Sequence, residues 1–358
     1  MSNIIDQPKE IRKGEELNID VLTQYLKANV EGFNEIKKVK QFPGGFSNLT
    51  YFVDTNLGEM VMRRPPFGAN IKSAHDMGRE FKVLTMLQGA GYHRIPKPIA
   101  YCQDLDVLGA EFYLMERVQG VILRSTPPKG IILDPKTIRS ISEGVIDNLA
   151  DLHAIDIHKT GLINIGKPEG YVERQVRGWA KRYIKSETDE VKSMNEASEW
   201  LIANMPKDTS SAFIHNDYKY DNVVLNADNL NEVKAVLDWE MSTVGDPLMD
   251  LGTAVGYWAE ADDGPEIKSF GLTATPGNYS RQEILQRYSD KTGRDVSNFL
   301  FYYVFASFKL GVIIQQIYAR YKKGHTQDPR FANLLYVVKG CGRNAQQAIK
   351  YGRIGDWR

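Results

Sequence analysis

Cysteine is scarce in this sequence, and neither sign of charge is in excess. Among 358 residues the two cysteines, Cys102 and Cys341, lie far apart and without a CxxC neighbour. This argues against a disulfide framework and against a structural zinc site. Lysine plus arginine and aspartate plus glutamate each number 45, so the formal net charge is zero. Without an overall basic field to attract phosphates, we expect no nucleic-acid partner.

A long uninterrupted hydrophobic run is also missing. The most apolar late stretch, "FYYVFASFKLGVIIQQIY" (301–318), is broken by Lys309 and by the pair Gln315 and Gln316, so it predicts a buried helix rather than a membrane span. The start, "MSNIIDQPKE", carries charges and a proline where a signal peptide needs an apolar core. We therefore expect a cytoplasmic protein with no membrane partner.

The pattern of the first third of the chain predicts a small α+β lobe. Hydrophobic residues make up 42% of the sequence and charged residues 25%, which is ordinary for a folded protein. The predicted elements are a helix behind the N-cap Asn18, a meander of three antiparallel strands, a helix and two more strands. They span residues 19–29, 36–64, 73–91, 98–102 and 110–118.

Past Gly120 the pattern becomes helical. Amphipathic helices are predicted at 134–156, 171–186 and 197–205, and again from 281 to the end. The length suits one large or two moderate domains. We therefore expect a bilobal α+β protein whose N-terminal antiparallel sheet lobe (1–117) precedes a larger helix-rich C-terminal lobe (118–358).

Two polar sites interrupt short apolar runs in the second lobe. In "FIHNDYKYDNVVL" (213–225) the apolar run stops at His215 and resumes at Val223. In "VKAVLDWEMSTVGDPLMDLG" (233–252) a β-branched run ends on Asp238. We expect two short strands that deliver their carboxylates to the same end of one sheet.

The first of these sites has the pattern H-x-D-x-x-x-x-N, formed by His215, Asp217 and Asn222, and it resembles the catalytic loop of kinases. A hydroxyl nucleophile must be oriented and relieved of its proton, a role that suits Asp217. A triphosphate needs Mg²⁺ held by hard oxygen ligands, which Asn222 and Asp238 could supply. The competing interpretation treats Asp217, Asp221 and Asn222 as turn formers. The spacing, the flanking apolar runs and "VLDWE" downstream favour the catalytic interpretation.

A glycine pair in the first lobe is a weaker candidate for phosphate binding. "PGGFSN" (43–48) lies between two predicted strands, and Gly44 and Gly45 would let the backbone approach a ligand closely. Their N–H groups and the hydroxyl of Ser47 could cradle phosphates. Taken alone, the stretch is explained better as a hairpin turn, and no GxGxxG or GxxxxGK[ST] occurs in the chain.

A basic strand end offers a second candidate in this lobe. In "EMVMRRPP", alternation sends Arg63 and Arg64 to opposite faces, so only one of them can face a ligand. An inward cation could neutralise phosphate oxygens, and Glu80 on the following helix could hold it in place. The alternative is an exposed basic strand end with an unrelated glutamate.

The two motifs of the second lobe look like the paired signatures of the aminoglycoside phosphotransferase family, which has a protein-kinase-like fold. The resemblance extends to "GGFSNLTYFV", "VMRRPP", "GREFKVLTML", "FYLMERVQG" and "LADLHAID" and covers roughly residues 40 to 255. It is closest to the branch that also occurs fused to acyl-CoA dehydrogenases. The family's loop is usually His-Gly-Asp, so Asn216 is a departure, although it touches no assigned role.

The resemblance implies a role for each matching position. Asp217 would be the catalytic base, or at least the residue that orients the acceptor hydroxyl, and Asn222 and Asp238 would be Mg²⁺ ligands. Arg63 falls where the family often has a phosphate-binding lysine, and Glu80 falls where the helix partner of that lysine lies. A guanidinium is larger than an ammonium and forked, which leaves the nucleotide preference open.

The resemblance also suggests a hinge and several supporting residues. The backbone of "MERV" (115–118), at Glu116 and Val118, would hydrogen-bond adenine. Glu240 would either assist a second metal ion or form a surface ion pair. Structural roles would fall to four residues: His215 under the catalytic loop, His153 on a buried helix, and Asp246 and Asp250, which would hold loops and cap a helix.

Together these features predict a transferase, a small-molecule kinase that moves the γ-phosphoryl group of ATP, with Mg²⁺, to an acceptor hydroxyl; GTP is left open as donor. A hydroxyacyl-CoA or similar metabolite suits the branch. The acidic stretch "AEADDGPE" (259–266) could attract a cationic acceptor such as an aminoglycoside, although charged loops are usually just solvated. The rival hypothesis is a nucleotide-binding pseudokinase module without turnover, which Arg63 hints at.

Overall fold

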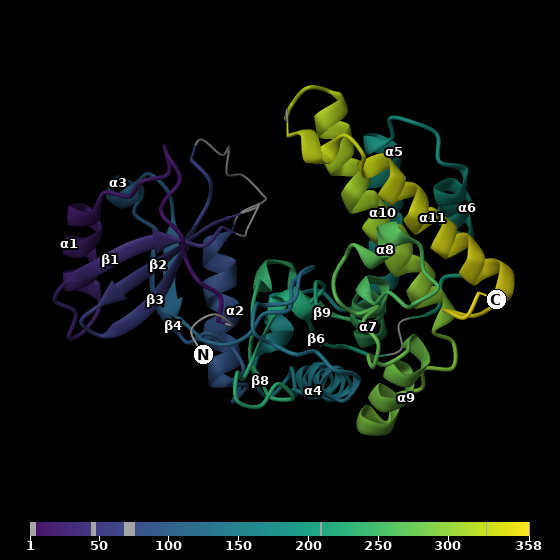
Figure 1. Ribbon diagram of the computed structural model, residues 1–358, viewed down its shortest axis with the longest axis horizontal. Coiled ribbons are helices and arrows are strands. Elements are labelled where there is room, and N and C mark those ends of the chain that lie inside the picture. The colour runs from purple at the N-terminus through teal and green to yellow at the C-terminus, as the bar shows by residue number, and fades with distance from the viewer. Residues whose placement is uncertain (1–4, 44–47, 68–75, 208–209, 327, 358) are drawn as a thin grey trace. The chain divides into compact units, whose positions relative to one another are not determined.

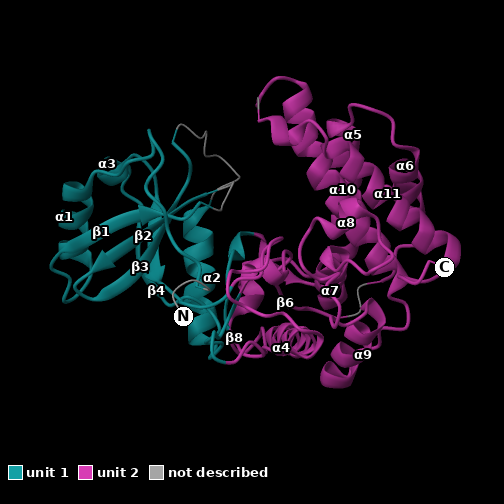
Figure 2. Cartoon of the chain, viewed as in Figure 1, with its two compact units in different colours: residues 1–121, 224–228, 234–240 teal, residues 122–223, 229–233, 241–358 magenta. Residues whose placement is uncertain are grey.

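The computed structural model of the chain describes residues 5–43, 48–67, 76–207, 210–326 and 328–357 (Figure 1). The chain divides into two compact units (Figure 2). Unit 1 comprises residues 1–121, 224–228 and 234–240, and unit 2 comprises residues 122–223, 229–233 and 241–358. The expected lobe boundary after residue 117 stays a prediction; the units place 118–121 and two short later segments with the sheet-bearing unit.

Unit 1 is built on one five-stranded antiparallel sheet with the order β1-β2-β3-β5-β4. Its strands are β1 (Ile36–Gln41), β2 (Leu49–Thr55), β3 (Gly58–Arg64), β4 (Pro98–Cys102) and β5 (Phe112–Glu116). The turn between β2 and β3 places Gly58 at φ 105°, a conformation that glycine adopts without strain. The predicted meander is therefore confirmed, and β5 is shorter than its predicted range at both ends.

Helices cover the sheet of unit 1 according to the alternation of its side chains. Helix α1 (Ile19–Asn29), capped as predicted by Asn18, shares a core with Tyr51, Val53 and Met62. Helix α2 (Met77–Gly89) contacts β4 and β5 instead, and Phe81 on it stacks against Tyr101. The short helix α3 (Leu105–Leu108) contacts α1. Successive β3 residues consequently point to different environments, as the alternation of a strand requires.

Two short sheets carry the segments on either side of the polar motifs. Strand β6 (Ala212–Ile214) pairs antiparallel with β9 (Thr243–Gly245), and β7 (Val223–Leu225) pairs with β8 (Val233–Val236). The strand before Asp217 and the strand before Asp238 are thus in different sheets. The expectation that they share one sheet was wrong, because each strand takes its partner from elsewhere in the chain.

Helices make up most of unit 2. They are α4 (Pro135–His153), α5 (Tyr171–Ser186), α6 (Lys192–Ala203), α7 (Pro247–Tyr257), α8 (Pro265–Lys268), α9 (Arg281–Thr292), α10 (Leu300–Lys322) and α11 (Leu334–Tyr351). The helix predicted at 197–205 begins five residues earlier, because Met194 adds a buried position one turn before Ala197 and Leu201. Helix α4 begins close to its predicted start, and its N-cap is Asp134.

Helix α10 is central to the packing of unit 2. It contacts α11, α7, α5 and α6. Within the described residues it is the one helix long and apolar enough to cross a membrane, and 78% of its most apolar window is buried inside the structure. It therefore packs as the buried helix that its interrupted sequence predicted.

Candidate active site

The catalytic-loop motif lies in unit 2 between β6 and β7, and its central carboxylate is held on several sides. Oδ2 of Asp217 accepts hydrogen bonds from Lys219 Nζ at 2.8 Å and from Asn222 Nδ2 at 2.9 Å. Oδ1 accepts a third from the hydroxyl of Tyr257, also at 2.9 Å. The side chain of Asp217 retains 16% of its exposure. Such a carboxylate is oriented and yet accessible, as a proton acceptor must be.

The backbone just before Asp217 is fixed by a buried carboxylate. Asp250, on α7, accepts hydrogen bonds from the N–H of His215 at 2.6 Å and from the N–H of Asn216 at 2.7 Å. The N–H of Asp217 in turn donates to Nδ1 of His215 at 3.2 Å. His215 is fully buried. It therefore lies under the loop and orients it, in the place that the resemblance implied.

Asn216 has a left-handed backbone with φ 66°. Glycine tolerates this region, and asparagine is the side chain that enters it at least cost, which accounts for Asn216 where the family usually has glycine. The amide also forms bonds that glycine could not: it accepts from the hydroxyl of Tyr171 and donates to the carbonyl of Met241, both at 3.1 Å. The departure thus serves the loop rather than being neutral.

Asp250 is itself embedded in a buried polar network. Oδ2 lies 3.1 Å from Nε2 of His153, whose Nδ1 lies 2.7 Å from the hydroxyl of Tyr288. Burial alone would raise the pKa of Asp250, but hydrogen bonds from His153 and His215 hold it below its usual range. The loop anchor is therefore charged near neutral pH. Asp246 caps α7 through the N–H of Leu248, so the predicted loop-holding and capping roles match these contacts.

The second polar motif reaches Asp238, which belongs to unit 1. Arg63 on β3 bridges two carboxylates, with Nη1 at 2.6 Å from Oε1 of Glu80 and Nη2 at 3.2 Å from Oδ1 of Asp238. Burial alone would lower the pKa of Arg63, but Glu80, Tyr113 and Asp238 raise it well above its usual value. Burial raises the pKa of Glu80, and Arg63 opposes that rise. Arg63 is thus a largely buried cation, with 11% of its side chain exposed, that is held against two acidic groups.

Arg64 points away from this cluster, as alternation predicts. Its guanidinium donates to the carbonyl of Leu108 and stacks 3.7 Å from the ring centroid of Phe67. Its side chain is buried, so the alternative of an exposed basic strand end does not hold. Of the two neighbouring arginines, Arg63 alone pairs with Glu80 on α2 and with Asp238.

Asp238 also has a left-handed backbone, with φ 66°. Left-handed conformations of non-glycine residues cost free energy and concentrate at functional sites. Two residues later, Oε2 of Glu240 accepts a hydrogen bond from the amide of Asn48 at 3.1 Å. Asn222 belongs to unit 2 and Asp238 to unit 1, so their meeting at one metal ion stays a prediction.

The predicted hinge (115–118) begins with the last two residues of β5. The N–H of Glu116 donates to the carbonyl of Lys97 at 2.8 Å, and the N–H of Arg117 donates to Glu59 at 3.2 Å. Val118 makes no backbone hydrogen bond to any residue that the structure describes. The peptide groups of the hinge are compatible with binding adenine, and that role stays a prediction. Gly44, Gly45 and Ser47 lie outside the described residues.

The acidic stretch 259–266 is not a solvated loop, contrary to expectation. Asp263 and Glu266 are buried. Asp263 pairs with Arg281, whose side chain is fully buried, and Glu266 pairs with Arg343. Arg281 also lies 3.4 Å from an oxygen of Glu260. The carboxylates were misjudged because their partners come later in the chain, from α9 and α11.

We expect Arg281→Met to destabilise the protein by about 3–5 kcal/mol, because it leaves the buried carboxylate of Asp263 without its cation. Chemical denaturation of the two proteins measures the difference. Arg139→Met removes the exposed pair with Glu283 and should leave stability nearly unchanged. Equal losses of stability in the two variants would contradict a stabilising role for the buried pair of Arg281 and Asp263.

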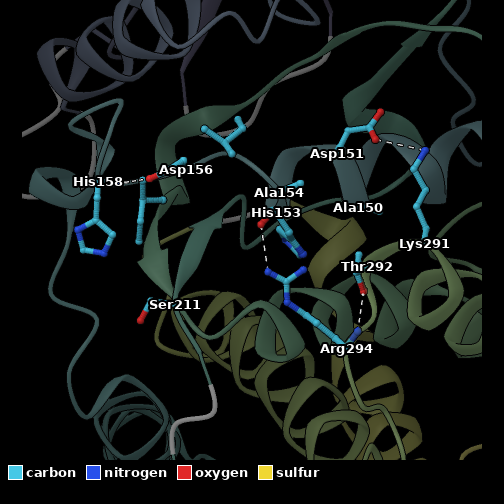
Figure 3. A pocket seen from close by; sticks show the side chains of 12 residues that line it. Ala150, Asp151, His153, Ala154, Asp156, His158, Ser211, Lys291, Thr292 and Arg294 are labelled. Atoms are coloured by element: carbon cyan, nitrogen blue, oxygen red, sulfur yellow. Dashed lines mark hydrogen bonds and ion pairs between the residues drawn. The ribbon is translucent and has the colours of Figure 1, made fainter.

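A cavity of about 620 Å³ lies in unit 2, away from the motif (Figure 3). The ends of α4 and α9 line it, and two of its basic residues are already engaged. Lys291 pairs with Asp151 at 3.2 Å, and Arg294 donates to the carbonyl of His153 at 3.1 Å. None of the predicted catalytic, nucleotide-binding or metal-binding residues that the structure describes lines this cavity.

Three residues near Asp217 were not assigned from the sequence. Lys219 lies inside the motif, so its spacing could have drawn attention to it. Tyr257 lies 40 positions further on, at the end of α7, with no local signal. Lys309 was noticed only as the charge that interrupts an apolar helix, and its Nζ donates to the carbonyl of Asn216 at 2.9 Å.

Comparison with known proteins decides the family. The model of the phosphotransferase enzyme family matches residues 38–283. The chain belongs to the phosphotransferase enzyme family. Together with its kinase-like relatives, this family supports small-molecule phosphotransfer as the general activity. The predicted resemblance to aminoglycoside phosphotransferases and the predicted protein-kinase-like α+β fold are confirmed.

Relatives known from sequence are larger proteins. The chain is 34% identical to acyl-CoA dehydrogenase family member 11 of Rattus norvegicus, covering 88% of this chain and 41% of the relative. It is 30% identical to the probable acyl-CoA dehydrogenase IBR3 of Arabidopsis thaliana, covering 89% of this chain and 41% of the relative. This phosphotransferase chain thus spans less than half the length of the curated relatives it matches.

Solved structures share the fold. One from Ralstonia eutropha, assigned as an aminoglycoside phosphotransferase, has a TM-score of 0.78 and 28% identity over 93% of this chain and 99% of its own. Choline kinase from Cryptosporidium parvum has a TM-score of 0.64 and 16% identity over 93% of this chain and 97% of its own. The second similarity concerns the phosphotransferase fold alone.

We expect Tyr257→Phe to lower kcat about tenfold, because the carboxylate of Asp217 loses one of the three hydrogen bonds that orient it. Steady-state phosphoryl transfer measures the change. Tyr101→Phe removes a hydroxyl that bonds Glu111 in unit 1 and should leave kcat unchanged. A kcat of Tyr257→Phe equal to wild type would mean that the hydroxyl does not orient the carboxylate of Asp217.

Proposed function

We propose that the protein transfers the γ-phosphoryl group of ATP to a hydroxyl of a small molecule. The observation that carries this proposal is the carboxylate of Asp217, oriented by three hydrogen bonds on a loop whose backbone is anchored by Asp250. Phosphoryl transfer needs positioning and charge stabilisation more than covalent chemistry. Asp217 would orient the acceptor hydroxyl and take its proton.

The donor nucleotide would be held by residues of unit 1. Arg63 is a largely buried cation whose Nη2 already faces a carboxylate, and a guanidinium can bind phosphate oxygens bidentately. The backbone at Glu116 and Val118 would bind the base, with Glu80 keeping Arg63 in place. GTP remains an alternative donor under this proposal.

Mg²⁺ would be held by Asn222 and Asp238. Within the described residues, neither Oδ1 of Asn222 nor Oδ2 of Asp238 accepts a hydrogen bond, so each offers a hard oxygen ligand. Across the part of the chain that the structure describes, there is no group of three or more His, Cys, Asp or Glu side chains that could hold a metal ion. Mg²⁺ usually takes one or two protein carboxylates and completes its shell with phosphates and water. When bound, it would neutralise charge on the phosphate oxygens.

For the acceptor we propose the hydroxyl of a hydroxyacyl-CoA or a similar metabolite. The support is that curated relatives over nearly the whole chain are named as acyl-CoA dehydrogenases. The acidic stretch 259–266 no longer favours a cationic acceptor such as an aminoglycoside, because arginines neutralise Asp263 and Glu266. A cytoplasmic location belongs to the same proposal.

Label transfer from γ-labelled ATP tests the function. Wild-type and Asp217→Asn proteins would be incubated with Mg²⁺ and a panel of hydroxyacyl-CoAs, free hydroxy acids and aminoglycosides. A labelled acyl-CoA product that disappears with Asp217→Asn supports both activity and acceptor. Labelled aminoglycoside alone would overturn the acceptor, and Mg·ATP binding without a labelled product would favour the pseudokinase module.

A further inference from the structure

A buried lysine lies beneath the catalytic loop. Lys309 is on α10 between the buried residues Phe308 and Leu310, and only 3% of it is exposed. Taking an ammonium ion out of water is strongly unfavourable, and well-packed apolar side chains of similar size often do better for stability. An apolar residue would satisfy the packing of this helix, so the retained charge points to another role.

The contacts of Lys309 identify that role. Its Nζ donates to the carbonyl oxygen of Asn216 at 2.9 Å and lies 3.3 Å from the hydroxyl of Thr253 on α7. The N–H of the same peptide group belongs to Asp217 and donates to Nδ1 of His215. The peptide plane that leads into Asp217 is therefore held at its oxygen by Lys309 and at its nitrogen by His215.

Charged groups of both signs surround Lys309. Asp217 of the loop and Asp250 of α7 favour the ammonium form, whereas Lys219 of the loop and Arg182 of α5 oppose it. Trp179, also on α5, places its ring centroid 5.8 Å from Nζ. Burial is the largest influence, and it lowers the pKa of Lys309 to about 8.

We propose that Lys309 is a positioning residue, which in its protonated form fixes the 216–217 peptide and so aims the carboxylate of Asp217. This proposal rests on the proposed phosphotransferase function. Near neutral pH the lysine is charged and the carbonyl of Asn216 keeps its charged donor. As pH rises past about 8, Lys309 loses its proton and the loop loses that restraint.

Lys309→Met separates this role from a structural one. Because the pKa of Lys309 is depressed in the folded protein, the unfolded chain binds more protons between about pH 8 and 10.5, and the charged lysine costs stability below that window. We therefore expect Lys309→Met to keep or raise Tm at pH 7. Its kcat should fall by up to about 10²-fold, because a small misplacement of a reacting group can lower the rate by that factor. KM for Mg·ATP should be unchanged. Wild-type kcat should fall above about pH 8, and the variant should lack this fall.

Hydrogen–deuterium exchange provides a readout without turnover. Peptides covering 213–225 should exchange faster in Lys309→Met than in wild type at pH 7, and the difference should narrow at about pH 9.5, where the wild-type lysine is neutral. Thr253→Val is the matched control, because it removes the hydroxyl contact and leaves the charge. It should behave as wild type.

A lower Tm for Lys309→Met with unchanged exchange in the loop would overturn the proposal. The same conclusion would follow if the kcat of Lys309→Met fell above about pH 8 as that of the wild type does. Exchange and Tm need no acceptor, so a protein that labels nothing in the transfer assay would defeat the proposed function and still leave the role of Lys309 decided.

Discussion

Asp217→Ala will lower kcat by about 10²–10⁴-fold, the usual contribution of a general base. The carboxylate accepts hydrogen bonds from Lys219, Asn222 and Tyr257, and the substitution removes the one group at this position that can take a proton. KM for Mg·ATP should change much less, because the residues proposed to bind the nucleotide base and phosphates lie in unit 1. Steady-state transfer of labelled phosphate measures both constants.

Asp221→Asn provides the matched control for this substitution. Asp221 lies in the same loop, and burial raises the pKa of its carboxyl group. An amide is therefore a mild replacement, and turnover should stay close to wild type. Retention of nearly full kcat by Asp217→Ala, or an equal loss in Asp221→Asn, would remove Asp217 from the role of base.

Asp238→Ala will abolish Mg²⁺-dependent turnover and weaken binding of Mg·ATP. The substitution removes the one carboxylate proposed to bind the metal, and it also takes away one of the two acidic partners of Arg63. Binding of ATP with and without Mg²⁺, followed by thermal shift, measures the effect, because a ligand stabilises the folded state that binds it. The gain in Tm from Mg²⁺ should disappear while ATP alone retains a small shift.

Glu240→Gln shows whether the effect belongs to position 238. It keeps an oxygen that can accept from Asn48 and removes a charge only two residues from Asp238. We expect a clearly smaller loss of Mg²⁺ dependence. If Asp238→Ala keeps a normal Mg²⁺ response, the metal assignment is wrong, and if both variants lose it alike, Glu240 must share the role.

Much of the architecture was predictable because it depends on local pattern. The alternation of the strands gave the meander of unit 1 and sent Arg63 and Arg64 to different environments. The N-cap Asn18 predicted the start of α1. The spacing of His215 and the residues that follow it predicted the loop that the structure describes.

What escaped prediction depends on contacts between distant parts of the chain. The strands before Asp217 and Asp238 were expected in one sheet, and pairing with β9 and β7 places them in two. Tyr257 reaches Asp217 across 40 positions, and Lys309 reaches Asn216 across 93. No local periodicity encodes such pairs. The buried partner of Asp263, at Arg281, escaped for the same reason.

The left-handed turn at Asn216 also has a consequence for the unfolded chain. Glycine would relax the turn, but it would give the denatured protein more backbone conformations, and losing them on folding costs roughly 0.4–1 kcal/mol. Asparagine restricts that ensemble and adds two hydrogen bonds, to Tyr171 and Met241, in the folded loop. Compared with glycine, asparagine therefore lowers the conformational entropy that the loop loses on folding, because it restricts the unfolded chain. This occurs at the residue that directly precedes the proposed base.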